Sequence, residues 1–546
     1  MKSTLKTDMR QMMLLSVVCL ICLIPFIGKP LHIDDPLYVW TAKQIAVAPT
    51  DFYGYRINWD WGVELPASDI IKNPPGMSYL LALAGVAGNW SETWLHLLVV
   101  VISLFLILGT YCLARELEAD PLVAALVTLC TPLFMMSATV VMGDILMATS
   151  WLWAVFFWIR GGRTSSHACL VVAALLVSVS FFTKYFGICL VPLLLCYQLI
   201  KRKNLALCLP YLLLPVLAVV VYQLWTAGLY GRGLLFDAAR FSVASKGGKL
   251  SLFGQGFVCL VFTGGGMLSL VSLLPLVPGA RKACSCLFVL FLVISSVLFL
   301  QGGYAGRPFA GPEGFQWLQL LHAALFGAVG TALIALLLWA VIVDRSAETL
   351  FLVLWIAGTL VFTAYLNWTI SGRNLLPSLP AVGILAGRLL PVTVNSRSPV
   401  LRYGFFGPVL LLSLMVAWGD KSHAESARLA AVRAGSLKTS ASQKLYFQGH
   451  WGFQYYLQLL GGVPADTRNM AGNRGDVLAI PANNSFTRMP DMNAVDLLET
   501  VTYRAGQLVS VMNPAAGAGY YASARGPLPY LFAKKHDETY YVFRYR

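Results

Sequence analysis

The chain consists largely of apolar blocks long enough to cross a lipid bilayer, which takes about 20 residues of α-helix. Of its 546 residues, 58% are hydrophobic and only 12% are charged. Soluble domains usually carry about 25% charged residues. A water-soluble fold would have to expose many of the apolar blocks. The sequence therefore predicts an all-α polytopic membrane protein.

Hydropathy predicts about thirteen transmembrane helices. If the N-terminus is cytoplasmic, Lys and Arg gather in the cytoplasmic connections, as in Lys201-Arg202-Lys203. This pattern fits the positive-inside rule, so the net charge of +15 indicates topology rather than nucleic-acid binding. The predicted span cores are residues 12–28, 93–114, 121–140, 145–160, 168–183, 186–200, 204–226, 256–277, 283–301, 318–342, 349–368, 374–391 and 403–419.

This orientation predicts which parts of the chain lie outside the cytoplasmic (inner) membrane. The two longest loops, 29–92 and 227–255, face outward, and so does the C-terminal segment. Residues 420–546 are more polar and contain no spanning run. We therefore predict a transmembrane domain over 1–419 and a small extracytoplasmic α/β domain over 420–546. Its predicted elements are strands at Lys444–Gln448, Gly475–Pro481 and Tyr540–Arg546 and a helix at Trp451–Leu460.

Two adjacent acids, Asp34 and Asp35, follow the end of the first span. Asp35 before Pro36 favours a helix start, with Asp as the N-cap and Pro as the first helical residue. A capping role and a catalytic role therefore explain the presence of Asp35 equally well. Capping does not explain Asp34. A carboxylate at the apolar boundary, next to a short surface helix over Pro36–Val47, suits a general base.

Three more charged residues, Asp144, Lys184 and Arg373, lie at the outer ends of predicted spans. Each has a structural alternative, namely a helix cap, a Lys that extends to the lipid headgroups and an interfacial Arg. Taken together, two acids and two cations on one side of the membrane suit group transfer from a phosphate. The carboxylate takes a proton from the acceptor, and the cations stabilise the charge on the leaving phosphate.

The sequence motifs around these charged residues, in their order along the chain, resemble those of the GT-C glycosyltransferases. The resemblance is to the family-39-like group, which includes the protein O-mannosyltransferases and the lipid A aminoarabinose transferase. It implies a GT-C fold and an inverting transfer of a hexosyl or pentosyl group from a polyprenyl-phosphate sugar. The motifs are Asp34-Asp35-Pro36-Leu37-Tyr38, Asn73-Pro74-Pro75, Met142-Gly143-Asp144, Thr183-Lys184-Tyr185, Arg373-Asn374-Leu375-Leu376-Pro377 and Gly449-His450-Trp451-Gly452-Phe453-Gln454-Tyr455-Tyr456.

The resemblance also implies a role for each site residue. Asp34 would be the base, and Asp35, which stands where the family has Glu, would support it. Asp144 would shape the acceptor site. Lys184 and Arg373 would bind the donor phosphate. Tyr38 and Asn73 would support the first outer loop.

The chain departs from the aminoarabinose transferases at Lys72-Asn73, where they have Glu-Lys. A metal ligand of that branch is therefore not assigned, and a divalent metal ion stays open. The identity of the sugar and the length of the carrier are also open. The acceptor is open as well, and a lipid, a glycan and a protein hydroxyl are all compatible with the sequence. The departure argues against the aminoarabinose reaction specifically.

Two other classes of function are compatible with the same residues. A transporter or flippase of polyprenyl-linked lipid would use the outer cations but would need alternating access. The sequence has no inverted repeat or paired interrupted helices, and a flippase would not need Asp34. A membrane scaffold with an extracytoplasmic binding domain would leave the set of motifs without a purpose.

Overall fold

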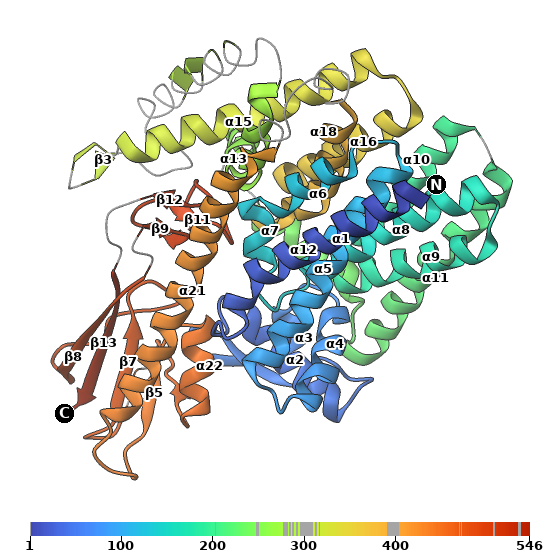
Figure 1. The fold of residues 1–546 in the computed structure, drawn as a ribbon. Helices are drawn as coiled ribbons and strands as arrows, with labels where there is room; N and C mark the ends of the chain where they lie inside the picture. Colours follow the sequence, from blue (N-terminus) through green and yellow to red (C-terminus); the bar gives the residue numbers. More distant parts are fainter. Residues whose placement is uncertain are drawn as a thin grey trace.

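The computed structural model shows a largely helical protein with a small C-terminal sheet (Figure 1). It describes residues 2–246 except 203, residues 251–276, isolated positions between 282 and 315, residues 317–389 and 403–468, residue 470, and residues 472–505, 508–532 and 537–546. The predicted span 283–301 lies mostly outside the described residues.

Among the described residues, six helical segments are long and apolar enough to cross a membrane. They belong to α1 (Lys2–Leu23), α5 (Glu92–Glu116), α8 (Asp144–Thr164), α11 (Leu205–Tyr230), α15 (Trp317–Val343) and α16 (Ala347–Val361). Shorter apolar helices include α4 (Gly76–Ala87), α9 (His167–Thr183), α10 (Leu190–Lys201) and α13 (Leu252–Gly266). The prediction of a multi-pass helical membrane protein is confirmed, whereas the number of thirteen spans stays a prediction.

The predicted span 121–140 is not one helix but two, α6 (Pro121–Leu129) and α7 (Pro132–Ser137). Pro132 lacks the N–H that a continuing helix needs, and its ring disfavours helical backbone at the preceding residue. Thr131 caps the second helix by accepting a hydrogen bond from the Phe134 N–H at 3.1 Å. Because α7 ends at Ser137, an irregular turn over residues 138–143 leads into α8.

The first long loop, residues 29–92, is a folded unit between α1 and α5. It contains α2 (Asp35–Val47), the antiparallel hairpin of β1 (Arg56–Asp60) and β2 (Val63–Pro66), α3 (Ala67–Ile70) and α4. Gly76 at the start of α4 packs against the end of α9, where an added Cβ would lie 2.5 Å from the Phe182 carbonyl oxygen. This close contact places the Asn73-Pro74-Pro75 turn beside the Thr183-Lys184 turn.

The C-terminal region begins inside a single long helix, α21 (Phe406–Ser436), which runs from the transmembrane helices to the sheet (Figure 1). The predicted boundary at 419/420 therefore falls within a helix, and the two-domain division stays a prediction. The sheet has the order β6-β5-β7-β13-β8 and carries α22 (Trp451–Leu459). Its strands are β6 (Val463–Pro464), β5 (Leu445–Phe447), β7 (Val477–Pro481), β13 (Asp537–Tyr545) and β8 (Val495–Arg504).

The sheet is mixed, since β5 pairs in parallel with β6 and β7, whereas β13 is antiparallel to both β7 and β8. The three predicted strands and the predicted helix are present, which confirms the α/β character of this region. The sequence analysis did not identify β8. Its exposure along the strand is irregular, so alternation of polar and apolar residues does not mark it.

Candidate active site

Four charged side chains from distant parts of the chain meet in one group, the charge cluster: Asp34, Asp144, Lys184 and Arg373. Arg373 Nη2 lies 3.1 Å from Asp34 Oδ2, and Arg373 Nη1 lies 3.9 Å from Asp144 Oδ2. Lys184 Nζ lies 2.5 Å from Asp144 Oδ1. The Asp34 side chain is 32% exposed, whereas that of Asp144 is 1% exposed. Asp34 is therefore the acid that a bound molecule can reach.

The ends of helices hold the cluster together. Asp144 is the first residue of α8, where a carboxylate is favoured by the helix dipole. Lys184 has an extended backbone (φ −149°) between the end of α9 and the next helical turn. Gly143 lets these two turns approach, because an added Cβ would lie 3.1 Å from Thr183 Cγ2. The ion pair between Asp144 and Lys184 thus joins two consecutive helices at the same end.

Arg373 is placed by contacts with the C-terminal region. It lies in α17 (Gly372–Leu375), whose first N–H donates to the Tyr520 carbonyl oxygen at 3.0 Å. Gly372 is packed so closely that an added Cβ would lie 2.4 Å from Tyr520 Cε2. This contact between α17 and the C-terminal region was not predicted from the sequence.

Asp35 is fully buried and accepts two backbone hydrogen bonds of 2.9 Å, from the N–H groups of His32 and Val141. The interpretation of Asp35 as an N-cap is wrong, because α2 begins at Asp35 and the cap position is Asp34, whose side chain makes no capping bond. The carboxylate instead fastens the first long loop to the turn before α8. Burial raises the pKa of Asp35 to about 7.

We expect this raised pKa to make stability depend on pH. Between the usual pKa of 3.8 and about 7, the folded state holds a proton on Asp35 that the unfolded state releases. The free energy of unfolding should therefore fall as pH rises from about 4 to about 7, by at most about 1.4 kcal/mol per pH unit, and then level off. Unfolding of detergent-solubilised protein at a series of pH values measures this slope.

Asp35→Asn should remove that part of the slope, although it loses one of the two backbone hydrogen bonds. Asp60→Asn is the matched control, because Asp60 lies in the same loop with a side chain that is 39% exposed. An identical pH slope in wild type and Asp35→Asn would contradict the assignment.

The two predicted loop-support residues differ in position. Tyr38 is buried beside the charge cluster, with ring atom Cε1 3.4 Å from where a Gly143 Cβ would lie. The Asn73 carbonyl accepts a hydrogen bond from the Tyr53 hydroxyl, which fixes the turn within the first long loop. Among the described contacts, Asn73 makes none with the charge cluster. The catalytic and binding roles of all these residues stay predictions.

A second buried group, which the sequence analysis missed, lies behind Arg373. Lys29 and Asp420 are both fully buried and form an ion pair. The Tyr521 hydroxyl donates to Asp420 Oδ2 at 2.6 Å, and the Arg373 guanidinium lies over the Tyr521 ring, 5.3 Å from its centroid. The available sequence signal was an acid, Asp420, immediately after the apolar run that ends at Gly419. Residues of three distant segments thus support one guanidinium.

No group of three His, Cys, Asp or Glu side chains in the described part of the chain is arranged to hold a metal ion. Asp34 and Asp144 are each paired with a cation of the protein itself. The divalent metal ion therefore stays a prediction, and no step proposed below depends on it.

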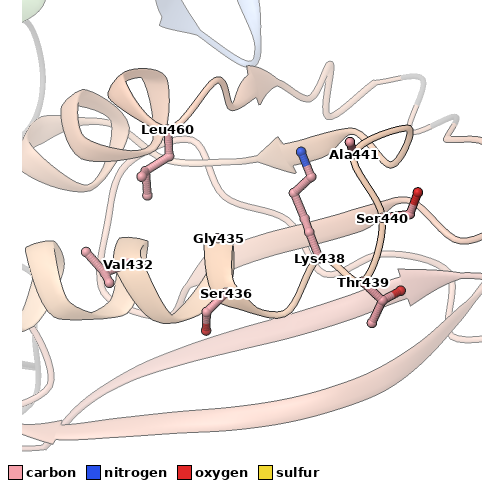
Figure 2. A pocket seen from close by; sticks show the side chains of 8 residues that line it. All are labelled: Val432, Gly435, Ser436, Lys438, Thr439, Ser440, Ala441 and Leu460. Atoms are coloured by element: carbon pink, nitrogen blue, oxygen red, sulfur yellow. The ribbon is translucent and has the colours of Figure 1, made fainter.

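A pocket of about 460 Å³ lies at the far end of α21 (Figure 2). It contains none of the cluster residues and is open to solvent. Its lining offers one cation, Lys438, and apolar or hydroxyl side chains rather than a convergent set of catalytic groups. This pocket is therefore a surface depression and not the active site. The lining residues are Val432, Gly435, Ser436, Lys438, Thr439, Ser440, Ala441 and Leu460.

Residues 72–225 match the sequence profile of the family described as dolichyl-phosphate-mannose-protein mannosyltransferase. The match includes Asn73, Asp144 and Lys184 and confirms the resemblance predicted from the motifs. The matched segment covers less than a third of the chain. Asp34 and Arg373 lie outside the matched segment, so their connection to the site comes from the distances above. A comparison with curated proteins gives no match.

The solved structures to which this chain is similar include the following three. The archaeal oligosaccharyltransferase AglB from Archaeoglobus fulgidus has a TM-score of 0.48 and 14% identity, covering 89% of this chain and 70% of that chain. ArnT from Cupriavidus metallidurans has a TM-score of 0.44 and 17% identity, with 86% and 92% covered. The arabinosyltransferase EmbB from Mycobacterium smegmatis has a TM-score of 0.33 and 15% identity, with 89% and 46% covered.

Proposed function

We propose that this glycosyltransferase moves a sugar from a polyprenyl-phosphate donor to a hydroxyl group at the charge cluster. The observation that carries the proposal is the position of Arg373, held between two carboxylates with Lys184 on the far side of Asp144. Arg373 Nε is buried and has no hydrogen-bond partner among the described residues. An acceptor supplied by a bound ligand would satisfy this donor.

The donor phosphate is that acceptor. A guanidinium presents several N–H groups in one plane and binds phosphate oxygens in pairs. Lys184 offsets the negative charge of Asp144, with which it forms an ion pair, so that Asp144 competes less with the phosphate for the guanidinium. Together they stabilise the negative charge that builds on the leaving phosphate. The matched family, which is named for a dolichyl-phosphate sugar donor, supports this donor class.

Asp34 is the general base in this proposal. As donor phosphate draws the guanidinium toward itself, the Asp34 carboxylate is released from its ion pair. It then takes the proton of the acceptor hydroxyl, whose oxygen bonds to the anomeric carbon. The bond from that carbon to the phosphate oxygen breaks at the same time, and its electron pair leaves with the polyprenyl phosphate. Attack from the opposite face inverts the configuration.

The reaction would take place outside the cytoplasm, because the distribution of Lys and Arg assigns the cluster to the outer side of the inner membrane. The acceptor class is a hydroxyl of a lipid, a glycan or a protein.

The experiment that tests the function uses purified protein in detergent, a polyprenyl-phosphate sugar labelled in the sugar, and an envelope extract as acceptor. Transfer of label to the extract supports a transferase. Binding of the donor without transfer would favour the flippase.

Arg373→Gln is expected to weaken binding of the donor by about 30- to 100-fold, because it removes a charge-assisted contact with phosphate. Arg373→Lys should keep part of the affinity, since it retains the charge but loses the planar fork. Equilibrium binding of labelled undecaprenyl phosphate measures both. Arg468→Gln is the control, because Arg468 has a 59% exposed side chain that pairs with Asp60 away from the cluster. Equal affinities in Arg373→Gln and wild type would contradict the phosphate assignment.

A further inference from the structure

The C-terminal region places a side chain against Arg373 of the charge cluster. The Arg373 guanidinium lies over the ring of Tyr521 at 5.3 Å, and Tyr521 is only 2% exposed. At this distance, a cation is attracted to the face of an aromatic ring, and the attraction is stronger away from water. Tyr521 is therefore a neutral contact of the guanidinium, as is the Met142 sulfur to which Arg373 Nη1 donates, whereas its ionic contacts are Asp34 and Asp144.

The Tyr521 side chain is fixed at its other end as well. Its hydroxyl donates to Asp420, and Asp420 is neutralised by the buried Lys29. If the ring turned away, a buried carboxylate would lose a charge-assisted hydrogen bond, which is costly without water to replace it. The ring orientation is thus set by Asp420 of α21 and by Lys29 at the start of the first long loop, not by Arg373 alone.

The backbone around Tyr521 also follows the segment that leads to Arg373. Gly372 N donates to the Tyr520 carbonyl at 3.0 Å, and Ser523 N donates to the Ile370 carbonyl at 2.8 Å. The two segments therefore keep a fixed spacing on both sides of Tyr521. Movement of this C-terminal segment must move α17 and its arginine.

A neutral ring has a specific advantage at this place. In the proposed reaction, Arg373 exchanges Asp34 for the donor phosphate as its anionic partner. A third carboxylate beneath the guanidinium would compete with the phosphate, whereas the ring face holds the cation without adding a full negative charge. The contact can therefore persist while the ionic partner changes.

We propose that Tyr521 is a positioning residue for Arg373, which makes the C-terminal region part of the donor-phosphate site rather than a separate binding module. The inference rests on the proposed function. It adds that recognition of the lipid phosphate depends on a residue nearly 150 positions further along the chain.

The test compares binding of two labelled lipids, undecaprenyl phosphate and undecaprenol, to full-length protein in detergent. Tyr521→Leu should weaken binding of undecaprenyl phosphate about tenfold and leave binding of undecaprenol unchanged. Tyr521→Phe keeps the ring face but loses the hydroxyl bond that fixes it to Asp420, so its affinity should fall between those of wild type and Tyr521→Leu. Tyr530→Phe is the control, because Tyr530 is equally buried in the same region and its hydroxyl donates to the Gly265 carbonyl instead.

A double-mutant cycle separates positioning from general stability. In the Arg373→Gln background, Tyr521→Leu should cause no further loss of affinity for undecaprenyl phosphate. A further tenfold loss there, or equal loss for both lipids, would overturn the inference. Wild-type affinity in Tyr521→Leu, alongside weak binding in Arg373→Gln, would overturn it and leave the proposed function standing. Failure of the wild type to bind undecaprenyl phosphate would overturn both.

Discussion

Replacing Asp34 with Asn is expected to lower the turnover number for sugar transfer by about 10³-fold, within the range that general-base catalysis contributes. The amide keeps the size of the carboxylate but cannot take the proton of an acceptor hydroxyl. The effect should fall on turnover rather than on donor binding. Asp34 now competes with the phosphate for Arg373, at 3.1 Å, and its neutral replacement competes less.

The measurement combines transfer of labelled sugar with direct binding of the donor lipid to the same preparation. Asp60→Asn provides the control, because it makes the same chemical change in the same loop at an exposed ion pair. It should transfer sugar at the wild-type rate. Full activity in Asp34→Asn would remove Asp34 from the chemistry. Loss of donor binding in Asp34→Asn would instead assign Asp34 to the architecture of the phosphate site.

Replacing Lys29 with Met is expected to reduce the free energy of unfolding by about 3–5 kcal/mol, because it leaves the Asp420 carboxylate buried without its counter-charge. Both side chains of this pair are fully buried. The remaining partner within 3 Å, the Tyr521 hydroxyl, supplies one hydrogen bond but no positive charge. Unfolding of the detergent-solubilised protein, followed by circular dichroism, measures the loss.

Two further variants serve as comparisons for the stability loss expected in Lys29→Met. Lys29→Met combined with Asp420→Leu removes both charges and should recover most of the lost stability, since a buried ion pair is often replaceable by apolar side chains. Glu499→Gln breaks an exposed pair with Arg433 and should cost less than about 1 kcal/mol. A Lys29→Met variant as stable as Glu499→Gln would show that Asp420 takes up a proton, reaches water or pairs with a protonated His32, whose Nε2 lies 3.6 Å from Asp420 Oδ1.

The membrane helices were predictable from the sequence because spanning a bilayer imposes a length and a composition on each segment. The boundaries of α5, α8 and α9 lie within a few residues of the predicted spans. The break between α6 and α7 was missed, because hydropathy reads through Pro132, which is apolar but interrupts the backbone hydrogen bonds.

The charge cluster was predictable in part. Ionisable residues at the ends of apolar runs are costly enough to suggest a purpose, and this consideration selected Asp34, Asp144, Lys184 and Arg373. It could not reveal that Arg373 connects the two acids. Nor could it separate Asp34 from Asp35, since only the backbone around His32 and Val141 shows that Asp35 is used as an anchor.

The sequence by itself determined that this protein lies in the membrane, which residues are costly to place there and which family its motifs resemble. Those properties follow from the local composition of each segment and from its order along the chain. The tertiary structure alone decided which charges pair, that Asp34 is the accessible acid and that Tyr521 lies beneath Arg373. These contacts join residues that lie between 40 and 339 positions apart along the chain. The strength of each contact depends on burial and distance, which only the packed chain defines.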